Sequence, residues 1–174
     1  MATVYYYRSP LGQITLVADG GALVGLWLSG QQGLSSDLLE QTDELVSPDA
    51  VANQQVIAAT RGWLDSYFAG DPLPAPPRLR LQGTDFRQEV WQQLQLIPYG
   101  ETRSYGELAA QLAQRRGVAR MSAQAIGGAV GQNPISIIVP CHRVVGANGA
   151  LTGYNGGVRL KQWLLEHEQQ VLRG

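Results

Sequence analysis

A proline-rich segment in the middle of the chain limits most strongly how it can fold. Residues 71–83, DPLPAPPRLRLQG, contain four prolines. Proline has no amide hydrogen to donate and its ring clashes with a preceding helical turn, so this segment cannot be a helix and is a poor central strand. The formal charge also changes sign here, from −4 over residues 1–82 to +3 over the rest of the 174-residue chain. We therefore predict a linker at 71–83 between two domains, residues 1–82 and 84–174.

The first domain is predicted to be α/β, a small antiparallel sheet with one helix. Three segments rich in β-branched and aromatic residues, 3–9, 12–19 and 22–28, are separated by the turn sequences PLG and DGG. Apolar residues at helical spacing then predict a helix over residues 49–69, which Gly70 ends.

The second domain is predicted to be mostly helical. Its predicted helices cover residues 84 or 85 to about 96, 104 to about 114, 122 to about 130, and about 161 to 170. Thr84 or Asp85 caps the first, the capping-box sequence SYGE begins the second, and Ser122 caps the third. The second and third helices fit a helix-turn-helix. The apolar run 135–139 predicts a strand that Pro140 ends.

Composition excludes several classes of protein. Hydrophobic residues make up 44% of the chain and charged residues 16%, as in globular rather than disordered proteins. A single cysteine cannot form an internal disulfide, which suits a reducing compartment. Residues 1–8 lack the features of a signal peptide, and no apolar run approaches the length that spans a membrane. We expect a cytoplasmic protein without membrane contact.

One long stretch of the second half contains no acidic residue. Between Glu107 and Glu166 there are six bases and no acid, the bases being Arg115, Arg116, Arg120, Arg143, Arg159 and Lys161. A cationic stretch of this kind favours a polyanion, of which nucleic acid is the usual one. A solvated basic face is the alternative, and charge alone does not separate the two.

The only cysteine, Cys141, lies in the sequence IIVPCHRVVG. A lone cysteine is commonly a buried structural thiol, but here Pro140 places it at a turn, with His142 and Arg143 beside it. Neighbouring positive charge or a base lowers the pKa of a thiol and makes it a nucleophile. The second histidine, His167, is interpreted as structural, although either of its acidic neighbours could orient a catalytic imidazole. The spacing of these residues fits no metal site.

Two glycine-rich segments flank the cysteine. The predicted helix 122–130 contains two adjacent glycines and several alanines. Each glycine costs a helix interior about 1 kcal/mol relative to alanine, so either tight helix packing or close approach by a bulky partner explains them. The segment TGYNGG, residues 152–157, is either a surface turn or a wall that packs on a flat ligand.

The sequence from Phe86 to Glu168 resembles the O6-alkylguanine-DNA alkyltransferases. The resemblance is carried by PCHRVVG with GYNGG downstream and NP upstream, and by FRQEVWQQLQLIPYGETRSYGELA. The first half is similar to the ribonuclease H-like domain of that family in pattern only. The resemblance implies a winged-helix-like second domain and transfer of an alkyl group from O6-alkylguanine, and from O4-alkylthymine, to the cysteine in a single turnover.

The resemblance also implies a role for each reacting residue. Cys141 would accept the alkyl group, His142 would act on it through a bound water, and Glu168 would orient His142. Asn133 would tie the preceding helix to the cysteine loop. Tyr105 would press on the phosphate of the target nucleotide and assist guanine as it leaves.

The implied partner is double-stranded DNA, which the helix after Ser122 would enter through the minor groove. The damaged base would flip out of the stack, at a cost of a few kcal/mol. The implied DNA-binding residues are Tyr105, Arg120, Ser122, Ala123, Gln124, Gly127, Gly128 and Arg143. The implied base pocket is formed by Val144, Val145, Tyr154, Asn155, Gly156 and Gly157. We expect a monomer without a cofactor.

The chain departs from the family pattern at two places. Gln124 stands where many relatives have an arginine that fills the gap left by the flipped base, and the segment 113–121, AQRRGVARM, is longer than in several relatives. No cysteine or histidine precedes Cys141, so we expect no structural zinc. Two alternatives remain for the function, which are a cysteine hydrolase using Cys141 and His142 and a DNA-damage sensor without transfer.

Overall fold

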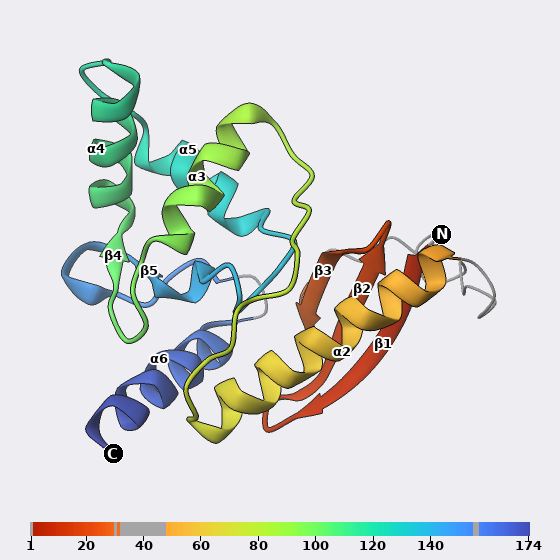
Figure 1. Cartoon of the computed structure of the whole chain (residues 1–174). Coiled ribbons are helices and arrows are strands. Elements are labelled where there is room, and N and C mark those ends of the chain that lie inside the picture. The colour runs from red at the N-terminus through yellow and green to blue at the C-terminus, as the bar shows by residue number, and fades with distance from the viewer. Residues whose placement is uncertain (1, 30, 32–47, 155–156) are drawn as a thin grey trace. The chain divides into compact units, whose positions relative to one another are not determined.

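In the computed structural model, which describes residues 2–29, 31, 48–154 and 157–174, the chain divides into the units Met1–Gln82 and Gly83–Gly174 (Figure 1). The first unit contains the strands β1 (Ala2–Ser9), β2 (Gly12–Asp19) and β3 (Ala22–Leu28), in the order β1-β2-β3. All pairs are antiparallel, so the predicted sheet is confirmed. Gly20 and Gly21 both have positive φ in the β2–β3 turn, a conformation that favours glycine.

One long helix completes the first unit. Helix α2 (Pro48–Ala69) lies along one face of the sheet (Figure 1), as predicted for residues 49–69. Its buried Trp63, Leu64 and Tyr67 form a core with sheet residues such as Leu16 and Leu26. Burial of such side chains contributes roughly 1.5–3 kcal/mol each.

The last part of the predicted linker pairs with the sheet. The Leu23 amide donates to the Arg78 carbonyl at 2.8 Å, and the Arg80 amide donates to the Leu23 carbonyl at 2.9 Å. The Arg80 guanidinium also contacts the Asp19 carboxylate at 2.7 Å. Residues 78–80, which follow the last proline, therefore cover the edge of β3 instead of bridging freely between the units.

The second unit is mostly helical, as predicted. Its elements are α3 (Asp85–Gln95), β4 (Arg103–Ser104), α4 (Tyr105–Arg116), α5 (Ala123–Gly131), the 3-10 helix η1 (Cys141–Arg143), β5 (Val144–Val145), the 3-10 helix η2 (Ala147–Gly149) and α6 (Val158–Arg173). Helices α4 and α5 contact each other across residues 117–122, in the predicted helix-turn-helix arrangement. Strands β4 and β5 pair in parallel. The buried Trp91 indole donates to the Ala129 carbonyl at 2.9 Å and links α3 to α5.

The predicted helix caps are present, and two helices are longer than predicted. The side chains of Thr84, Ser104 and Ser122 each accept a backbone N–H in the first turn of their helix. Helix α4 continues to Arg116, where Gly117 at φ 68° ends it. Helix α6 extends three residues beyond the prediction at both ends. Within the described ranges, every helix is too short or too polar to cross a lipid bilayer.

The prediction of a strand over residues 135–139 is wrong. These residues form a turn in which the Val139 amide donates to the Ile135 carbonyl at 3.2 Å and Ile137 has φ 69°. The Asn133 side chain accepts from the Ile135 amide at 3.0 Å and donates to the Val139 carbonyl at 2.8 Å. Asn133 thus provides a hydrogen-bond partner at each end of the turn. The apolar residues that we predicted to form a buried strand are buried in a turn instead.

Candidate active site around Cys141

Cys141 begins η1 directly after the turn that Asn133 holds together. Its side chain is buried, and burial raises the pKa of the thiol above its ordinary value. The polar side chains of Asn133 and Tyr154 and the charge of Lys161 act in the opposite direction without overcoming burial. The cysteine therefore rests as a thiol at neutral pH, and a base must remove its proton. We expected His142 and Arg143, its neighbours in sequence, to lower the pKa of Cys141. The residues that act to lower it are instead Asn133, Tyr154 and Lys161, which lie farther away in the sequence.

His142 is paired with a carboxylate in the interior. Its Nε2 lies 2.5 Å from Oε2 of Glu168, and both side chains have no exposed surface. A carboxylate only accepts, so Nε2 carries the hydrogen and Nδ1 has the free lone pair. Burial lowers the pKa of His142, which keeps the ring neutral. Nδ1 is buried, and among the described residues none offers it a hydrogen bond. Of the two acidic neighbours of His167, it is Glu168 that pairs with an imidazole, and that imidazole belongs to His142.

Arg143 lies in the interior, so the prediction that it contacts DNA is wrong. Its Nε donates to Glu168 Oε1 at 2.8 Å, Nη2 donates to Oε2 at 3.2 Å, and Nη1 donates to the Ile97 carbonyl at 2.8 Å. Its guanidinium also lies 5.5 Å from the centre of the Tyr99 ring. The side chain thus holds Glu168 in place and has no reach to a phosphate.

Glu168 is the centre of this buried network. It also accepts from the Gly100 amide at 3.0 Å, so three segments of the chain meet at one carboxylate. Burial alone would raise the pKa of Glu168, but hydrogen bonds from His142 and Arg143 and the positive charge of Arg143 hold it well below the ordinary value. Glu168 stays ionised, and its charge is shared between the orienting hydrogen bond and the arginine.

Tyr105 and Lys161 meet at one carbonyl. Lys161 Nζ donates to the Thr152 carbonyl at 3.0 Å, and Tyr105 Oη donates to the same oxygen at 3.4 Å. Lys161 Nζ lies 5.8 Å from the centre of the Tyr105 ring. Burial raises the pKa of Tyr105 and lowers that of Lys161, so the phenol remains protonated. The Thr152 carbonyl thereby fixes the cysteine-side loop to α4 and α6.

Lys161, one of the six bases of the acid-free stretch, was not predicted to belong to this site. It has no exposed surface although it carries a charge. Lys161, Leu164 and Glu168 are spaced so that they share one face of α6, and all three are buried. The sequence does contain a sign of this, because Lys161 occupies a position on the helix face that also carries the apolar Leu164.

Four of the six predicted pocket residues lie in the described part of the chain. Val144 and Val145 are buried in β5, and the side chain of Tyr154 acts to lower the pKa of the Cys141 thiol. Gly157 caps α6 with φ 103°, a conformation that favours glycine. Asn155 and Gly156 lie outside the described residues.

The predicted DNA-binding residues of α5 lie on an open surface. Ser122, Ala123 and Gln124 are exposed at the start of the helix, and Gly128 is exposed one turn later. A side-chain carbon added to Gly128 would meet no atom within 4 Å, and at Gly127 it would touch only the Tyr105 ring, at 3.8 Å. Packing within the unit therefore does not require glycine at these two positions. Arg120 is exposed in the loop before α5.

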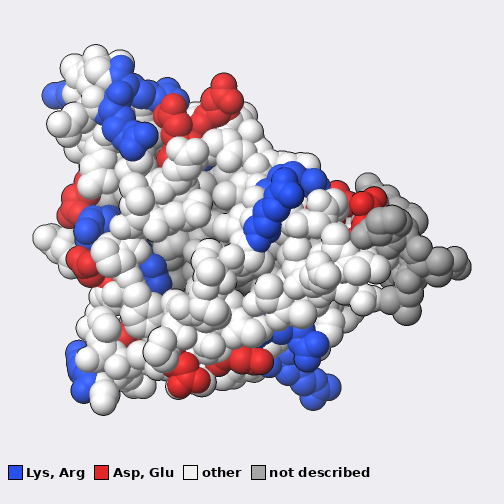
Figure 2. Space-filling view, viewed as in Figure 1, with Lys and Arg blue, Asp and Glu red and all other residues white. Residues whose placement is uncertain are grey.

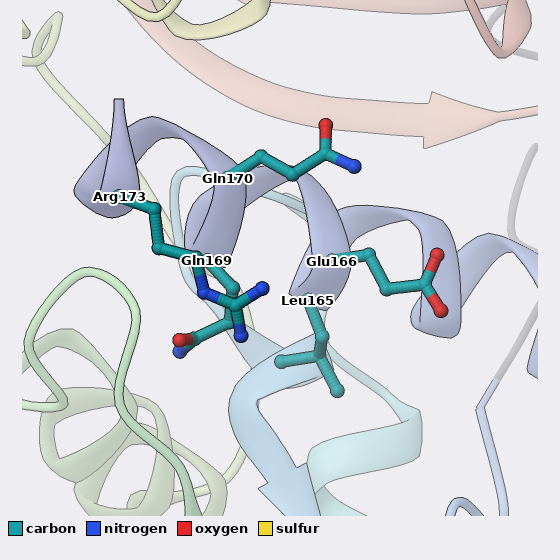
Figure 3. A pocket seen from close by; sticks show the side chains of 5 residues that line it. All are labelled: Leu165, Glu166, Gln169, Gln170 and Arg173. Carbon is teal, nitrogen blue, oxygen red and sulfur yellow. The ribbon is translucent and has the colours of Figure 1, made fainter.

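A separate hollow lies on another face of α6. Leu165, Glu166, Gln169, Gln170 and Arg173 line it, with a volume of about 370 Å³ (Figure 3). It contains no nucleophile and does not include the buried face of Lys161 and Glu168. His167 stacks on Trp163 with ring centres 4.9 Å apart, as a structural residue would. The described residues contain no group of His, Cys, Asp or Glu side chains that could hold a metal ion.

Both halves of the chain match described families. Residues 85–170 match the family "6-O-methylguanine DNA methyltransferase, DNA binding domain" and residues 4–80 match "6-O-methylguanine DNA methyltransferase, ribonuclease-like domain". A Mycobacterium tuberculosis protein named methylated-DNA–protein-cysteine methyltransferase is 45% identical, over 94% of this chain and 92% of that protein. A protein of the same name from Methanosarcina acetivorans is 38% identical, over 95% of this chain and 98% of its own length.

Solved structures agree with these matches. The crystal structure of Mycobacterium tuberculosis OGT in complex with DNA has a TM-score of 0.77 and 42% identity, and covers 97% of this chain and 94% of that chain. The similarity extends over both units, including the segment that contains Cys141 and Glu168. The chain therefore belongs to the methylated-DNA–protein-cysteine methyltransferase family.

Proposed function

We propose that this protein repairs DNA directly, by transferring a methyl or small alkyl group from O6 of guanine, and from O4 of thymine, to its own Cys141. The observation that carries the proposal is the buried thiol of Cys141 next to a neutral histidine that Glu168 orients. The similarity of the whole chain to methylated-DNA–protein-cysteine methyltransferases supports the same reaction. A free thiol as acceptor suits the reducing cytoplasm, which is the proposed location.

The chemistry follows from the protonation states of three groups. His142 Nδ1, directly or through a water molecule, takes the proton of the Cys141 thiol. The thiolate sulfur forms a bond to the alkyl carbon while the bond from that carbon to O6 breaks, and guanine departs with the electron pair. The Tyr105 hydroxyl, still protonated because burial raises its pKa, donates a hydrogen bond or proton to the departing base. No metal or cofactor takes part in these steps.

Each molecule acts once. The product at Cys141 is a thioether, which water does not cleave under ordinary conditions. The groups described around Cys141 supply a base, an orienting carboxylate and a phenol, and none of these is a nucleophile that would remove the alkyl group. This separates the proposal from a cysteine hydrolase, whose thioester intermediate turns over with water.

The proposed partner is duplex DNA, to which the protein binds as a monomer. Helix α5 enters the minor groove, and the damaged base flips out of the duplex toward Cys141. Gly128 is exposed and Gly127 is half-buried beside Tyr105, and the absence of side chains at both positions supports close approach of DNA to this helix. Gly127 adjoins Tyr105, so a nucleotide leaving the duplex at this point would meet the phenol first.

The test is the intact mass of the protein after mixing with a duplex that carries one O6-methylguanine, followed by peptide mapping. We expect one added methylene unit on Cys141, saturating at one per protein, and no addition in Cys141→Ala, which still binds the duplex. Many turnovers per protein would establish the hydrolase instead. Tight binding of the duplex without any gain in mass would establish the damage sensor.

A second experiment tests the α5 surface. Gly128→Leu should stabilise the fold, because glycine in a helix interior costs about 1 kcal/mol and the added side chain meets open space. The same substitution should weaken binding of duplex DNA, since the side chain projects where the minor groove would lie. Gly128→Ala serves as the matched control with less bulk. A Gly128→Leu protein that binds the duplex as tightly as Gly128→Ala contradicts this docking.

A further inference from the structure

The loop after α4 folds back along that helix and leaves a groove. Gly117 ends α4 with a left-handed conformation, and the following residues return toward α5. The groove has a volume of about 420 Å³; Gly106, Ala109, Ala110 and Ala113 of α4 form one side, and Val118 to Met121 form the other. Arg120 is the only charged residue among those that line it.

The groove connects two parts of the proposed DNA surface. Its lining begins at Gly106, the residue after Tyr105, and ends at Ala123, the residue before Gln124. A strand of DNA that contacts both Tyr105 and α5 would therefore pass beside this groove.

The charges around the groove are positive and only partly neutralised. Figure 2 shows basic side chains gathered over the loop end of α4, where Arg115, Arg116 and Arg120 are exposed. Arg116 is neutralised by Glu89, at 2.7 Å, and lies over the Phe86 ring. Arg115 and Arg120 form no ion pair with any described residue. Arg115 lies in the last turn of α4, where a positive charge interacts favourably with the helix dipole, and this explains a base at that position. Arg120 lies beyond the end of the helix, so the dipole does not explain it.

We infer that this groove binds one sugar–phosphate backbone of duplex DNA, with deoxyribose against its alanine side and a phosphate on Arg120. The inference rests on the proposed function and adds a second contact outside α5. A backbone strand alternates apolar sugar and anionic phosphate, which matches methyl-lined walls with arginine at the rim. The site also returns positive charge to a DNA surface where Gln124 stands in place of an arginine.

The first experiment counts phosphate contacts through salt dependence. The logarithm of affinity falls with the logarithm of salt concentration by about 0.9 for each phosphate neutralised. Arg120→Gln should reduce that slope by about 0.9, so that the loss of affinity between about 50 and 200 mM salt becomes roughly 3.5-fold smaller. Arg115→Gln, Arg116→Gln and Arg173→Gln remove the same charge outside the groove and are matched controls that should leave the slope unchanged. Equal slopes in all four variants overturn the inference.

The second experiment tests the groove without changing charge. Ala110 is exposed and lines the groove, whereas Gln111 is exposed on the same helix and does not. Ala110→Leu should lower affinity for an unmodified duplex several-fold with an unaltered salt slope, and Gln111→Leu should not. If Ala110→Leu binds normally, the groove takes no DNA, and any occupant is another macromolecule.

The mass measurement on the unsubstituted protein separates this inference from the proposed function. A methylated Cys141 with equal salt slopes in every variant would leave the proposed function intact and remove the backbone site. Reduced slopes without methylation of Cys141 would keep the backbone site and remove the transfer.

Discussion

The acid-free stretch of the chain contains two kinds of cation that look alike in sequence. Four of them, Arg115, Arg116, Arg120 and Arg159, are exposed, whereas Arg143 and Lys161 are buried. The buried pair find acceptors within the fold, namely Glu168 and the carbonyls of Ile97 and Thr152. Only the exposed cations remain available to a polyanion. A count of charges along the sequence therefore overestimates the number of cations available to bind a polyanion, because it includes those that are buried and paired inside the fold.

The largest expected difference between the two kinds concerns stability. Arg143→Met should lower the free energy of unfolding by about 3–5 kcal/mol, because it leaves the buried carboxylate of Glu168 without its arginine. Arg115→Met should change it by less than about 0.5 kcal/mol, as at other exposed sites. Urea denaturation of both variants measures the difference. Arg143→Lys, which keeps charge but loses the bidentate contact, should fall between them, and equal values for Arg143→Met and Arg115→Met would contradict the comparison.

This contrast also explains what the sequence could and could not predict. The strands, the helix caps at Thr84, Ser104 and Ser122, and the orientation of His142 by Glu168 follow from local patterns or from the family motif. The bend at 135–139 was missed because its cause is the side chain of Asn133, which caps both ends of the turn, and apolar content alone gives no sign of this. Arg143 was misplaced because its partner lies 25 residues away in α6.

A second effect of the buried pair concerns the rate of transfer. Lys161→Met should slow single-turnover transfer roughly ten- to hundredfold, since a hydrogen bond from a charged group contributes about 1.5–3 kcal/mol. The reason is that Tyr105 then holds the Thr152 carbonyl alone, and Cys141 loses the positive charge of Lys161, which lowers its pKa. Quenched-flow measurement with a methylated duplex gives the rate. Lys161→Arg should recover part of it, and Arg159→Gln, an exposed cation on the same helix, should stay within about twofold. A Lys161→Met protein as fast as Arg159→Gln would show that burial of the lysine has no consequence for chemistry.

The buried histidine gives the comparison a pH dependence. Burial lowers the pKa of His142, so its lone pair persists below the ordinary histidine value of about 6.5, and transfer should fall only at more acidic pH. Protonation of His142 then removes the base. The raised pKa of Cys141 means that without this base the thiolate forms only in alkaline solution. In His142→Gln, transfer should therefore be slow at neutral pH and increase with pH. A pH profile for His142→Gln that coincides with that of the unsubstituted protein would remove His142 from the reaction.

The same pKa shifts predict how stability changes with pH. The pKa of His142 and that of Glu168 are both lower in the folded than in the unfolded chain, so the unfolded chain binds more protons as the solution becomes acidic. The free energy of unfolding should decrease as pH falls below about 6.5 and decrease further through the carboxylate range near 4.3. Urea midpoints over this range measure it. His142→Gln should lose the upper part of the decrease and keep the lower part.

The smallest expected effect comes from adding a cation on the exposed side. Gln124→Arg places a charge at the start of α5, where the side chain is exposed, so the free energy of unfolding should change by less than about 0.5 kcal/mol. If the new guanidinium reaches DNA, the salt slope should increase by up to about 0.9 and affinity should rise a few-fold at low salt. Titration of an unmodified duplex at several salt concentrations measures both. A large loss of affinity would mean that the glutamine amide makes a specific contact that charge cannot replace, and the exposed surface would then depend on hydrogen-bond geometry as strictly as the buried network around Glu168 does.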